Sequence, residues 1–245
     1  MAAMQDQWRL LEVQEHDTRL AQLAHRRRGL PELAAIEALT AQARSAADEL
    51  VAARTVETDL RRELAKAEAD VAQVRQRADR DRARLDAGQG SAKDLQATQH
   101  ELESLARRQA DLEDVELEVM ERVEAGQTRL AAARAAVDRL DAELAEATVR
   151  RDSALAGLDA EAGAQTTARA GAAAGVPADL LALYERIREH SGGVGAAKLA
   201  QRRCGGCRLE LTANDLAGAR GAAPDAVLRC EECGCILVRT AESGL

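Results

Sequence analysis

Apolar residues recur at alternating steps of three and four positions along much of the first half of the chain. Beginning at Ile36, such steps reach apolar side chains at thirteen of fifteen positions, and the two exceptions are Glu57 and Asp81. The run ends at Leu85 and covers seven heptads. A sustained period of 3.5 residues is typical of helices that wind around each other in a left-handed coiled coil. The sequence therefore predicts one long amphipathic helix in this region.

A second periodic segment runs from Leu95 to Leu158 and is less regular. Its apolar seam is interrupted by residues that are polar or small: Thr98, Gln109, Glu116, Gly126 and Arg151. Between the two segments, "DAGQGSAKD" contains two helix-breaking glycines, and Ser91 with Asp94 forms the pattern of a capping box. A short turn between two long amphipathic helices makes them antiparallel neighbours. We therefore expect a helical hairpin with its tip at about residues 86–94.

Glycine, proline and alanine mark the other boundaries. "RRRGLPEL" predicts a kink near residues 29–31 in a helix that begins near Gln5. The Ala-, Gly- and Thr-rich stretch 157–176 loses the heptad pattern and predicts a joint. Pro177 suits the start of a short helix that Gly192 and Gly193 end. The predicted domains are a hairpin over residues 1–176 and a smaller module over residues 177–245.

The smaller module contains all five cysteines. They form a C-x2-C pair, a gap of twenty-two residues and a second C-x2-C pair, with one surplus cysteine: Cys204, Cys207, Cys230, Cys233 and Cys235. Each C-x2-C loop can direct two thiolates at one metal ion, and two loops complete a closed tetrahedral site. A thioredoxin-like redox motif would need a βαβ unit, which the sequence does not predict. The first four cysteines are therefore the predicted ligands of one structural Zn²⁺.

Short β-prone runs flank the two loops at residues 208–211, 226–229 and 236–239. They predict a zinc ribbon, a small sheet in which the metal ion substitutes for an apolar core. Gly205 and Gly206 in the first loop, and Gly234 after the second, are expected to use positive φ angles to turn N–H groups toward sulfur. Cys235 is interpreted as a free thiol at the start of the last strand, and the alternative is that it competes with Cys233 for the metal.

Composition and charge support this mainly α architecture. They also disfavour nucleic-acid binding by the hairpin and a membrane partner. Aromatic residues make up 1% of the chain and charged residues 31%, which is typical of long helices rather than of a thick core. The segment 177–245 has nine basic and nine acidic residues, so the net charge of −8 belongs to the first 176 residues. An acidic body repels nucleic acid phosphates. Without a signal sequence or an apolar run of about 20 residues, we expect a cytoplasmic protein with no membrane partner.

A basic group surrounds the first cysteine loop in "KLAQRRCGGCR". Its members are Lys198, Arg202, Arg203 and Arg208. These side chains could bind a phosphate backbone or an acidic protein surface. The alternative is that they balance the charge of four thiolates. Because the chain has almost no aromatic residues, it offers no platform for base stacking, so any contact with RNA or DNA is expected to be directed at the backbone.

The segments 92–124, 176–193 and 204–237 together resemble the bacterial C4-type zinc-ribbon family with an N-terminal coiled-coil hairpin. The tip is similar to the family pattern Lys-Asp/Glu-x-Gln-Ala-Leu-x-x-Glu, which is matched here by Lys93, Asp94, Gln96, Ala97 and Glu101. Thr98 and Cys235 depart from the family, which usually has Leu and commonly Arg at these positions. The resemblance implies a nucleic-acid-binding or adaptor protein, with Lys93, Asp94 and Gln96 as candidate partner contacts at the tip.

Two functions are compatible with the sequence. The first is a non-enzymatic adaptor that docks a protein partner through ribbon and hairpin. The second is a protein that binds RNA or DNA through the basic ribbon. The sequence has no phosphate-binding glycine loop, no nucleophile motif and no open metal site, so an enzyme is not predicted. The heptad pattern is also compatible with self-association.

Overall fold

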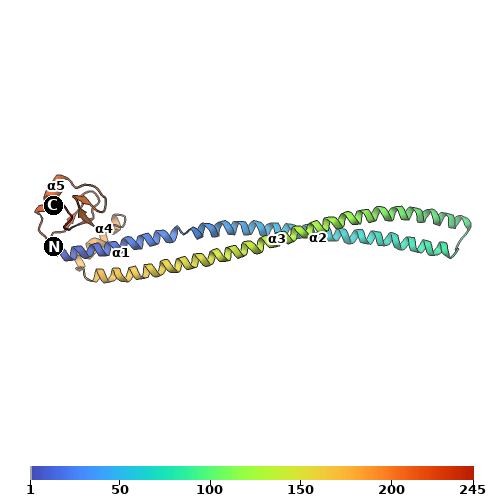
Figure 1. Cartoon of the computed structure of the whole chain (residues 1–245), viewed down its shortest axis with the longest axis horizontal. Helices are drawn as coiled ribbons and strands as arrows, with labels where there is room; N and C mark the ends of the chain where they lie inside the picture. Colours follow the sequence, from blue (N-terminus) through green and yellow to red (C-terminus); the bar gives the residue numbers. More distant parts are fainter. Residues whose placement is uncertain (1) are drawn as a thin grey trace. The chain divides into compact units, whose positions relative to one another are not determined.

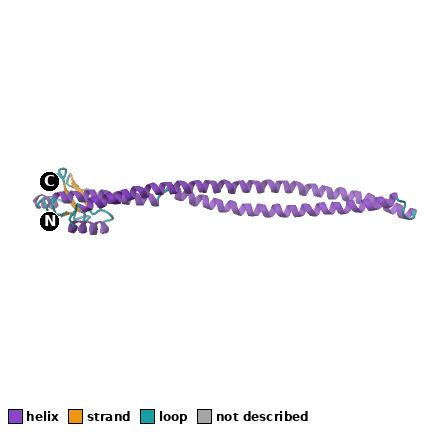
Figure 2. Cartoon of the chain, turned by 90° about the horizontal axis from the view of Figure 1, so that it is seen from below, coloured by secondary structure: helices purple, strands orange, loops and turns teal. Residues whose placement is uncertain are grey.

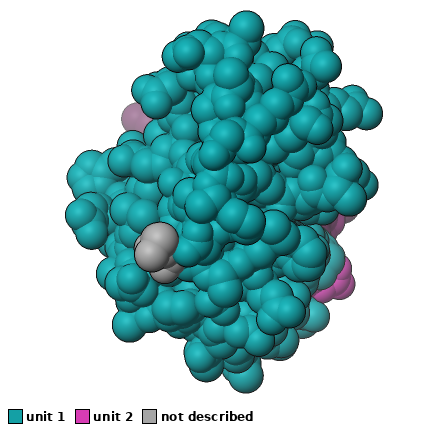
Figure 3. Space-filling model, turned by 90° about the vertical axis from the view of Figure 1, so that its left-hand side faces the viewer, with its two compact units in different colours: residues 1–33, 149–245 teal, residues 34–148 magenta. Residues whose placement is uncertain are grey.

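A computed structural model describes residues 2–245 and divides them into two compact units. One unit consists of residues 34–148, and the other combines residues 1–33 with residues 149–245 (Figure 3). The sequence predicts a boundary after residue 176, whereas the contacts in the structure group the N-terminal helix with the C-terminal region.

The unit of residues 34–148 is an antiparallel pair of helices. Helices α2 (Pro31–Asp86) and α3 (Ala92–Ala174) lie side by side here, joined by the turn at residues 87–91 (Figures 1 and 2). Leu60 of α2 packs against Val119 and Val123 of α3, all three on the predicted seams. The coiled-coil hairpin is therefore confirmed. Among the described residues, no helix is apolar over a length that could cross a membrane.

The turn between the two helices is built as its sequence predicts. Gly88 and Gly90 have φ angles of 59° and 128°, which favour glycine. The backbone N–H of Ser91 donates to Asp94 Oδ2 at 3.0 Å, and the N–H of Asp94 donates to Ser91 Oγ at 3.3 Å. These two reciprocal bonds form the predicted capping box at the start of α3.

Two exceptions to the apolar seams lie opposite each other. Glu57 of α2 is 5% exposed and forms an ion pair with Arg61 one turn later. Across from it, Gly126 leaves room on α3, since a Cβ there would lie 3.0 Å from Leu60 Cδ1. The missing side chain thus allows the two helices to approach where the seam contains a carboxylate.

The second unit begins with helix α1 (Met4–Arg28), which is followed by two non-helical residues before α2 starts at Pro31. This break falls where the sequence predicts a kink. Helix α3 continues through residues 157–174, where the sequence predicts a joint, and ends at Ala174. Helix α4 (Ala178–His190) follows after the turn at residues 175–177. Within this unit α1 is joined to the end of α3 by ion pairs such as Arg27–Asp159, 2.9 Å.

The sheet of this unit has four short strands. They are β1 (Ala196–Ala200), β2 (Arg203–Cys204), β3 (Leu228–Arg229) and β4 (Ile236–Arg239), in the order β2-β1-β4-β3. Strands β1 and β4 pair in parallel, and the two outer pairings are antiparallel. Helix α5 (Ala213–Gly221) lies in the connection between β2 and β3, and Thr212 and Asp215 form its capping box.

The predicted strands are only partly correct. Residues 236–239 form a strand, but the strand predicted at 226–229 is shortened to two residues. The prediction for 208–211 is wrong, because this segment forms only an isolated bridge, Arg203–Glu210. Strand β1 was not predicted, since "AAKLA" has low β propensity and forms a strand through its pairing with β4, about 40 residues later.

The sheet has an apolar core in addition to the metal site. Leu10 and Val13 of α1, Tyr184 of α4, and Ile236 and Val238 of β4 are all fully buried in one cluster. The expectation that a metal ion substitutes for a core is therefore corrected. Apolar residues of α1 and α4 pack with those of the strands in this cluster, which also contains Cys204, Cys230 and Cys235.

Candidate metal centre and its surroundings

The four predicted ligands lie on two loops that close with the same backbone hydrogen bond. One loop follows the start of β2 and the other lies between β3 and β4: Cys204 and Cys207, then Cys230 and Cys233. In each loop the residue after the second cysteine has a left-handed backbone, with φ of 65° at Arg208 and 72° at Gly234. Its N–H donates to the carbonyl of the first cysteine, at 2.7 Å for Arg208 and 2.8 Å for Gly234.

Close packing, and not a positive φ angle, explains the two glycines of the first loop. Only Gly234, among the three glycines named for this purpose, has the predicted positive angle. A Cβ at Gly205 would lie 2.8 Å from the Lys198 carbonyl oxygen, and one at Gly206 would lie 3.2 Å from Cys235 Sγ. The N–H of Gly206 does donate to Cys204 Sγ, at 3.3 Å. The prediction of an N–H···S bond is confirmed, and its conformational explanation is corrected.

The sulfur positions fit one tetrahedral zinc ion. All four Sγ atoms lie within 4.8 Å of one another, and the pairs Cys204–Cys233 and Cys207–Cys230 are each 3.8 Å apart. Zinc–sulfur bonds of about 2.3 Å in a tetrahedron place the sulfurs about 3.8 Å apart. Burial raises the pKa of the Cys204 thiol to about 12, so a thiolate there needs a bound cation. The four cysteines therefore form a structural zinc site with no open position.

Cys235 lies directly against this cluster. Its side chain is fully buried, and its Sγ is 3.5 Å from Cys204 Sγ and 3.4 Å from Cys233 Sγ. Burial raises the pKa of the Cys235 thiol well above its ordinary value, and the neighbouring sulfurs act in the same direction. The thiol therefore lies within reach of the ligand positions.

This position predicts that Cys235 can replace one ligand. In Cys233→Ser, we expect the chain to retain one zinc ion with weakened affinity, because a spare sulfur lies 3.5 Å from Cys204 Sγ. In Cys230→Ser, whose sulfur lies beside Cys207, we expect the ion to be lost. Zinc stoichiometry, measured by competition with a chromophoric chelator, checks both results. Equal loss of zinc in the two variants would contradict the replacement, and Cys233→Ser/Cys235→Ser serves as the control that removes both thiols.

The four basic residues predicted around the first loop are all exposed in the structure. We call Lys198, Arg202, Arg203 and Arg208 the basic rim. Lys198 and Arg203 share one exposed face of the β1–β2 pair, because Ala200, two residues after Lys198, pairs with Arg203. Arg202 lies in the turn between these strands, and its N–H donates to the Ser243 carbonyl at 3.0 Å. Within residues 2–245, no member of the rim forms an ion pair.

Other arginines of the ribbon have structural roles. The guanidinium of Arg239 donates to the carbonyls of Ala219 and Ala222 at 3.3 and 2.9 Å, where α5 ends. Arg229 Nε donates to the Gly234 carbonyl at 3.0 Å and braces the second cysteine loop. The rim differs from these arginines because its charges are directed to solvent.

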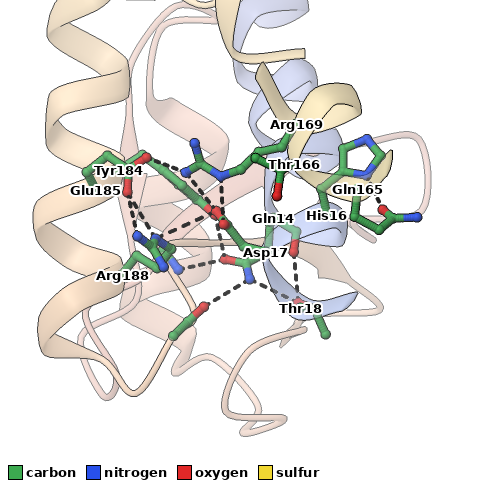
Figure 4. A network of polar contacts seen from close by, with 12 residues as sticks. Gln14, His16, Asp17, Thr18, Gln165, Thr166, Arg169, Tyr184, Glu185 and Arg188 are labelled. Carbon is green, nitrogen blue, oxygen red and sulfur yellow. Dashed lines mark hydrogen bonds and ion pairs between the residues drawn. The ribbon is translucent and has the colours of Figure 1, made fainter. Parts of the chain in front are cut away.

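A buried polar network connects α1, α3 and α4 beneath the sheet (Figure 4). Gln14 of α1 is 8% exposed, and its Oε1 accepts from the N–H of Gly195 at 2.7 Å. Its Nε2 donates to the Gly193 carbonyl at 3.0 Å. One amide side chain therefore satisfies the backbone of the segment that leads into β1, which explains how α1 positions the ribbon.

Asp17 is the centre of this network (Figure 4). The guanidinium of Arg169 donates to both of its oxygens, at 2.7 and 3.0 Å, and Tyr184 donates its O–H at 2.7 Å. Arg188 lies 3.6 Å away, and Glu185 also pairs with Arg169. Burial alone would raise the pKa of Asp17, but the bonds from Arg169 and Tyr184 and the two positive charges outweigh it and lower the pKa. Sequence reasoning missed this network, because its residues come from three segments with no shared motif.

The three tip residues are placed at the start of α3. Lys93 and Gln96 are exposed, while the carboxylate of Asp94 is used by the capping box. The bonds from Ser91 lower the pKa of Asp94 below its ordinary value. Thr98, which departs from the family pattern, donates its hydroxyl to the Asp94 carbonyl at 3.0 Å. Partner contact through Lys93 and Gln96 stays a prediction.

Comparisons with known proteins agree with this architecture. The CT398-like coiled coil hairpin domain matches residues 13–192, and the C4-type zinc ribbon domain matches residues 203–237. An uncharacterized protein of Mycobacterium tuberculosis strain H37Rv is 42% identical over 238 residues, 97% of each chain. A solved Mycobacterium smegmatis structure is also 42% identical, covers 98% of this chain and 100% of its own, and has a TM-score of 0.83. CT398 from Chlamydia trachomatis shares the fold at 14% identity, with a TM-score of 0.64 over 96% of this chain and 98% of its own.

Proposed function

Because the chain belongs to the family of CT398-like coiled-coil hairpin proteins and has a C4-type zinc ribbon, we propose that it is a non-enzymatic adaptor that docks an acidic protein surface on its basic rim. The family resemblance inferred from the cysteine and tip motifs is thereby confirmed. The observation that carries the proposal is the set of four exposed cations beside the metal site, none of which forms an ion pair within the described chain.

The metal centre supports this role by fixing the rim in space. Bound zinc supplies a rigid cross-link, because it joins four side chains of two loops. The four thiolate ligands leave no position for a reacting water, so the ion has a structural role. Arg208 lies directly after Cys207, and Arg203 directly before Cys204, so the loop that binds the ion also fixes the positions from which these side chains extend. Such a fixed array loses less conformational freedom on binding than a flexible basic tail would.

The rim favours a protein partner over nucleic acid on two grounds. The described chain has only two aromatic residues, Trp8 and Tyr184, and Tyr184 is fully buried, so stacking on bases is not supported. The chain also has a net charge of −8, which repels a long polyanion more than a compact acidic patch. At the hairpin tip, the exposed Lys93 and Gln96 are proposed as a second contact with a partner.

A direct binding experiment tests the rim. Labelled poly-L-glutamate and a uridine oligonucleotide are each titrated with the full-length, zinc-loaded chain at two salt concentrations. Binding of poly-L-glutamate is expected to weaken about tenfold in Lys198→Ala/Arg203→Ala, since each lost charge pair contributes up to about 1 kcal/mol. It is also expected to weaken as salt screens the charges.

The matched control is Arg186→Ala/Arg220→Ala, which removes two exposed arginines of α4 and α5 outside the rim. The control variant is expected to bind as the unmodified chain does. Rim-dependent binding of the oligonucleotide without binding of poly-L-glutamate would instead favour the nucleic-acid function. Binding of neither probe at low salt would contradict a docking role for the rim.

A further inference from the structure

One side of the hairpin unit, residues 34–148, has basic side chains in one block and acidic side chains, with two large apolar ones, in another. On α2, alternating steps of three and four residues connect Val51, Arg54, Thr58, Arg61, Ala65 and Glu68. On α3, the same steps connect Leu117, Met120, Glu124, Gln127, Ala131 and Arg134. Residues at these spacings lie on one side of a helix. The two rows belong to the same side of the hairpin, because a shallow groove of about 390 Å³ is lined from both of them. We call this side the groove face.

The groove itself is the basic block of this face. Arg54 and Arg61 of α2 and Arg134 of α3 are among the residues that line it. Arg61 pairs with the buried carboxylate of Glu57. Arg54 and Arg134 form no ion pair within residues 2–245, although many other arginines of the hairpin do. The groove therefore presents two positive charges without a carboxylate partner.

The other block of the groove face is acidic and apolar. Leu117 and Met120 are 58% and 47% exposed, and at a spacing of three residues they form one apolar surface on α3. The ion pairs Arg75–Glu113 and Glu63–Arg122, at 2.6 and 2.9 Å, fix the antiparallel register of the two helices. This register places Glu68 level with Leu117 and Met120. Glu68 and Glu124 form no ion pair within the described chain.

We propose that the groove face binds a second copy of this chain. The basic block near Thr58 and the acidic, apolar block near Glu68 are about 15 Å apart along α2, at about 1.5 Å per residue. A two-fold axis between the two blocks places the basic block of each copy against the acidic, apolar block of the other copy. Leu117 and Met120 of each copy then cover the groove of its partner, and Glu68 and Glu124 face Arg54 and Arg134.

A second copy fits this face better than a nucleic acid does. A phosphate backbone could use the arginines of the groove, but it would also meet Glu57, Glu68 and Glu124 and the acidic hairpin around them. It would leave Leu117 and Met120 exposed to water. A second copy contacts both blocks. Its acidic residues pair with the arginines of the groove, and Leu117 and Met120 of each copy are removed from water. This dimer does not involve the basic rim, so the two proposals can fail independently.

Sedimentation equilibrium of the full-length, zinc-loaded chain tests the dimer. The chain is expected to dimerise reversibly, and raising the salt from about 0.05 to about 0.5 M is expected to weaken the dimer because it screens the four charges. Leu117→Glu/Met120→Glu is expected to raise the dimer Kd at least about tenfold. Val56→Glu is the matched control, because Val56 is 50% exposed but lies two residues from Arg54, off the groove face. The control is expected to leave the Kd unchanged.

Charge exchange gives a second test that a folding defect cannot imitate. Arg54→Glu/Arg134→Glu and Glu68→Arg/Glu124→Arg are each expected to be monomeric, since every contact in either homodimer becomes repulsive. Mixed together, the two variants are expected to form a heterodimer, because both contacts then pair opposite charges. The unmodified chain sedimenting as a monomer throughout, a dimer that persists in Leu117→Glu/Met120→Glu, or the absence of a heterodimer from the mixture would each overturn the proposal. Binding of a uridine oligonucleotide that requires Arg54 and Arg134, in a chain that stays monomeric, would overturn it in favour of nucleic acid.

Discussion

Replacing Cys230 with serine is expected to release the structural zinc and to unfold the sheet of the ribbon, while α2 and α3 stay helical. Cys230 provides one of four sulfurs that lie within 4.8 Å of one another, and its neighbour at 3.8 Å is Cys207 Sγ, so the spare thiol of Cys235 is not expected to replace it. Structural zinc binds small domains with an apparent free energy of about 10–16 kcal/mol. This is comparable to the whole stability of an ordinary domain, about 5–15 kcal/mol. The apolar contacts with α1 and α4 are therefore not expected to hold the sheet without the ion.

The chain contains its own reporter for this change. Trp8 is the only tryptophan, and its indole N–H donates to the Arg239 carbonyl at 2.9 Å, at the end of β4. Loss of the sheet breaks this bond, so the Trp8 emission is expected to shift to longer wavelength. The far-UV circular dichroism is expected to change little, because α2 and α3 contain 56 and 83 residues and lie outside the sheet.

Cys235→Ala is the matched control for this experiment. It removes a thiol from the same cluster but leaves the four predicted ligands, so one zinc ion and the Trp8 emission are expected to remain. A chelator added to the unmodified chain is expected to reproduce the Cys230→Ser result. A zinc-free chain with unchanged Trp8 emission and unchanged resistance to proteolysis would show that the apolar core alone folds the ribbon.

The hairpin could be predicted because its information is local and repeats. Each heptad between Ile36 and Leu85 has its apolar residues on the same side of α2, so single exceptions such as Glu57 do not obscure the pattern. The turn residues are equally local, since Gly88, Gly90 and the Ser91–Asp94 pair specify the tip within a few positions. The sequence could not show that Gly126 lies opposite Glu57, because this depends on the register between two helices.

The second unit was harder to predict because its decisive contacts join distant segments. Strand β1 pairs with β4, which lies about 40 residues later in the sequence. Gln14 of α1 accepts a hydrogen bond from the N–H of Gly195, although the two residues are far apart in the sequence. No local pattern indicates either contact. The same reason explains the missed core, since Leu10 and Val13 appear in the sequence as one more stretch of helix.

In the metal site, the sequence predicts the four ligands but not the position of the fifth cysteine. The four ligands follow from their spacing, because each C-x2-C loop is a self-contained turn. The position of Cys235 against Cys204 depends on how β4 pairs with its neighbours, so the sequence left two interpretations open. The composition of the rim was visible in "KLAQRRCGGCR", but the shared face of Lys198 and Arg203 required the β1–β2 register.

Replacing Asp17 with alanine is expected to lower the free energy of unfolding of the second unit by about 3 kcal/mol. Removing one partner of a buried ion pair costs about 3–5 kcal/mol, because the remaining charge loses its compensation. Asp17 has a 7% exposed side chain and pairs with Arg169, whose charge is still partly neutralised by Glu185 in the variant. The lower end of the range is therefore expected. Urea unfolding followed through Trp8 fluorescence measures the change.

The pH dependence of this loss separates the ion network from simple packing. The pKa of Asp17 is depressed in the folded chain, whereas the unfolded value is about 3.9. The stabilisation is therefore fully present above about pH 4 and is lost as the pH falls through the lower, folded pKa. The difference in unfolding free energy between the unmodified chain and Asp17→Ala should shrink as the pH falls below about 4. It is compared only at pH values at which both chains still bind zinc, because loss of the ion is itself expected to unfold the sheet. Asp159→Ala breaks the exposed Arg27 pair and is expected to cost at most about 1 kcal/mol. A difference that stays constant down to the most acidic measurement would mean that Asp17 stabilises the unit through packing and not through its charge.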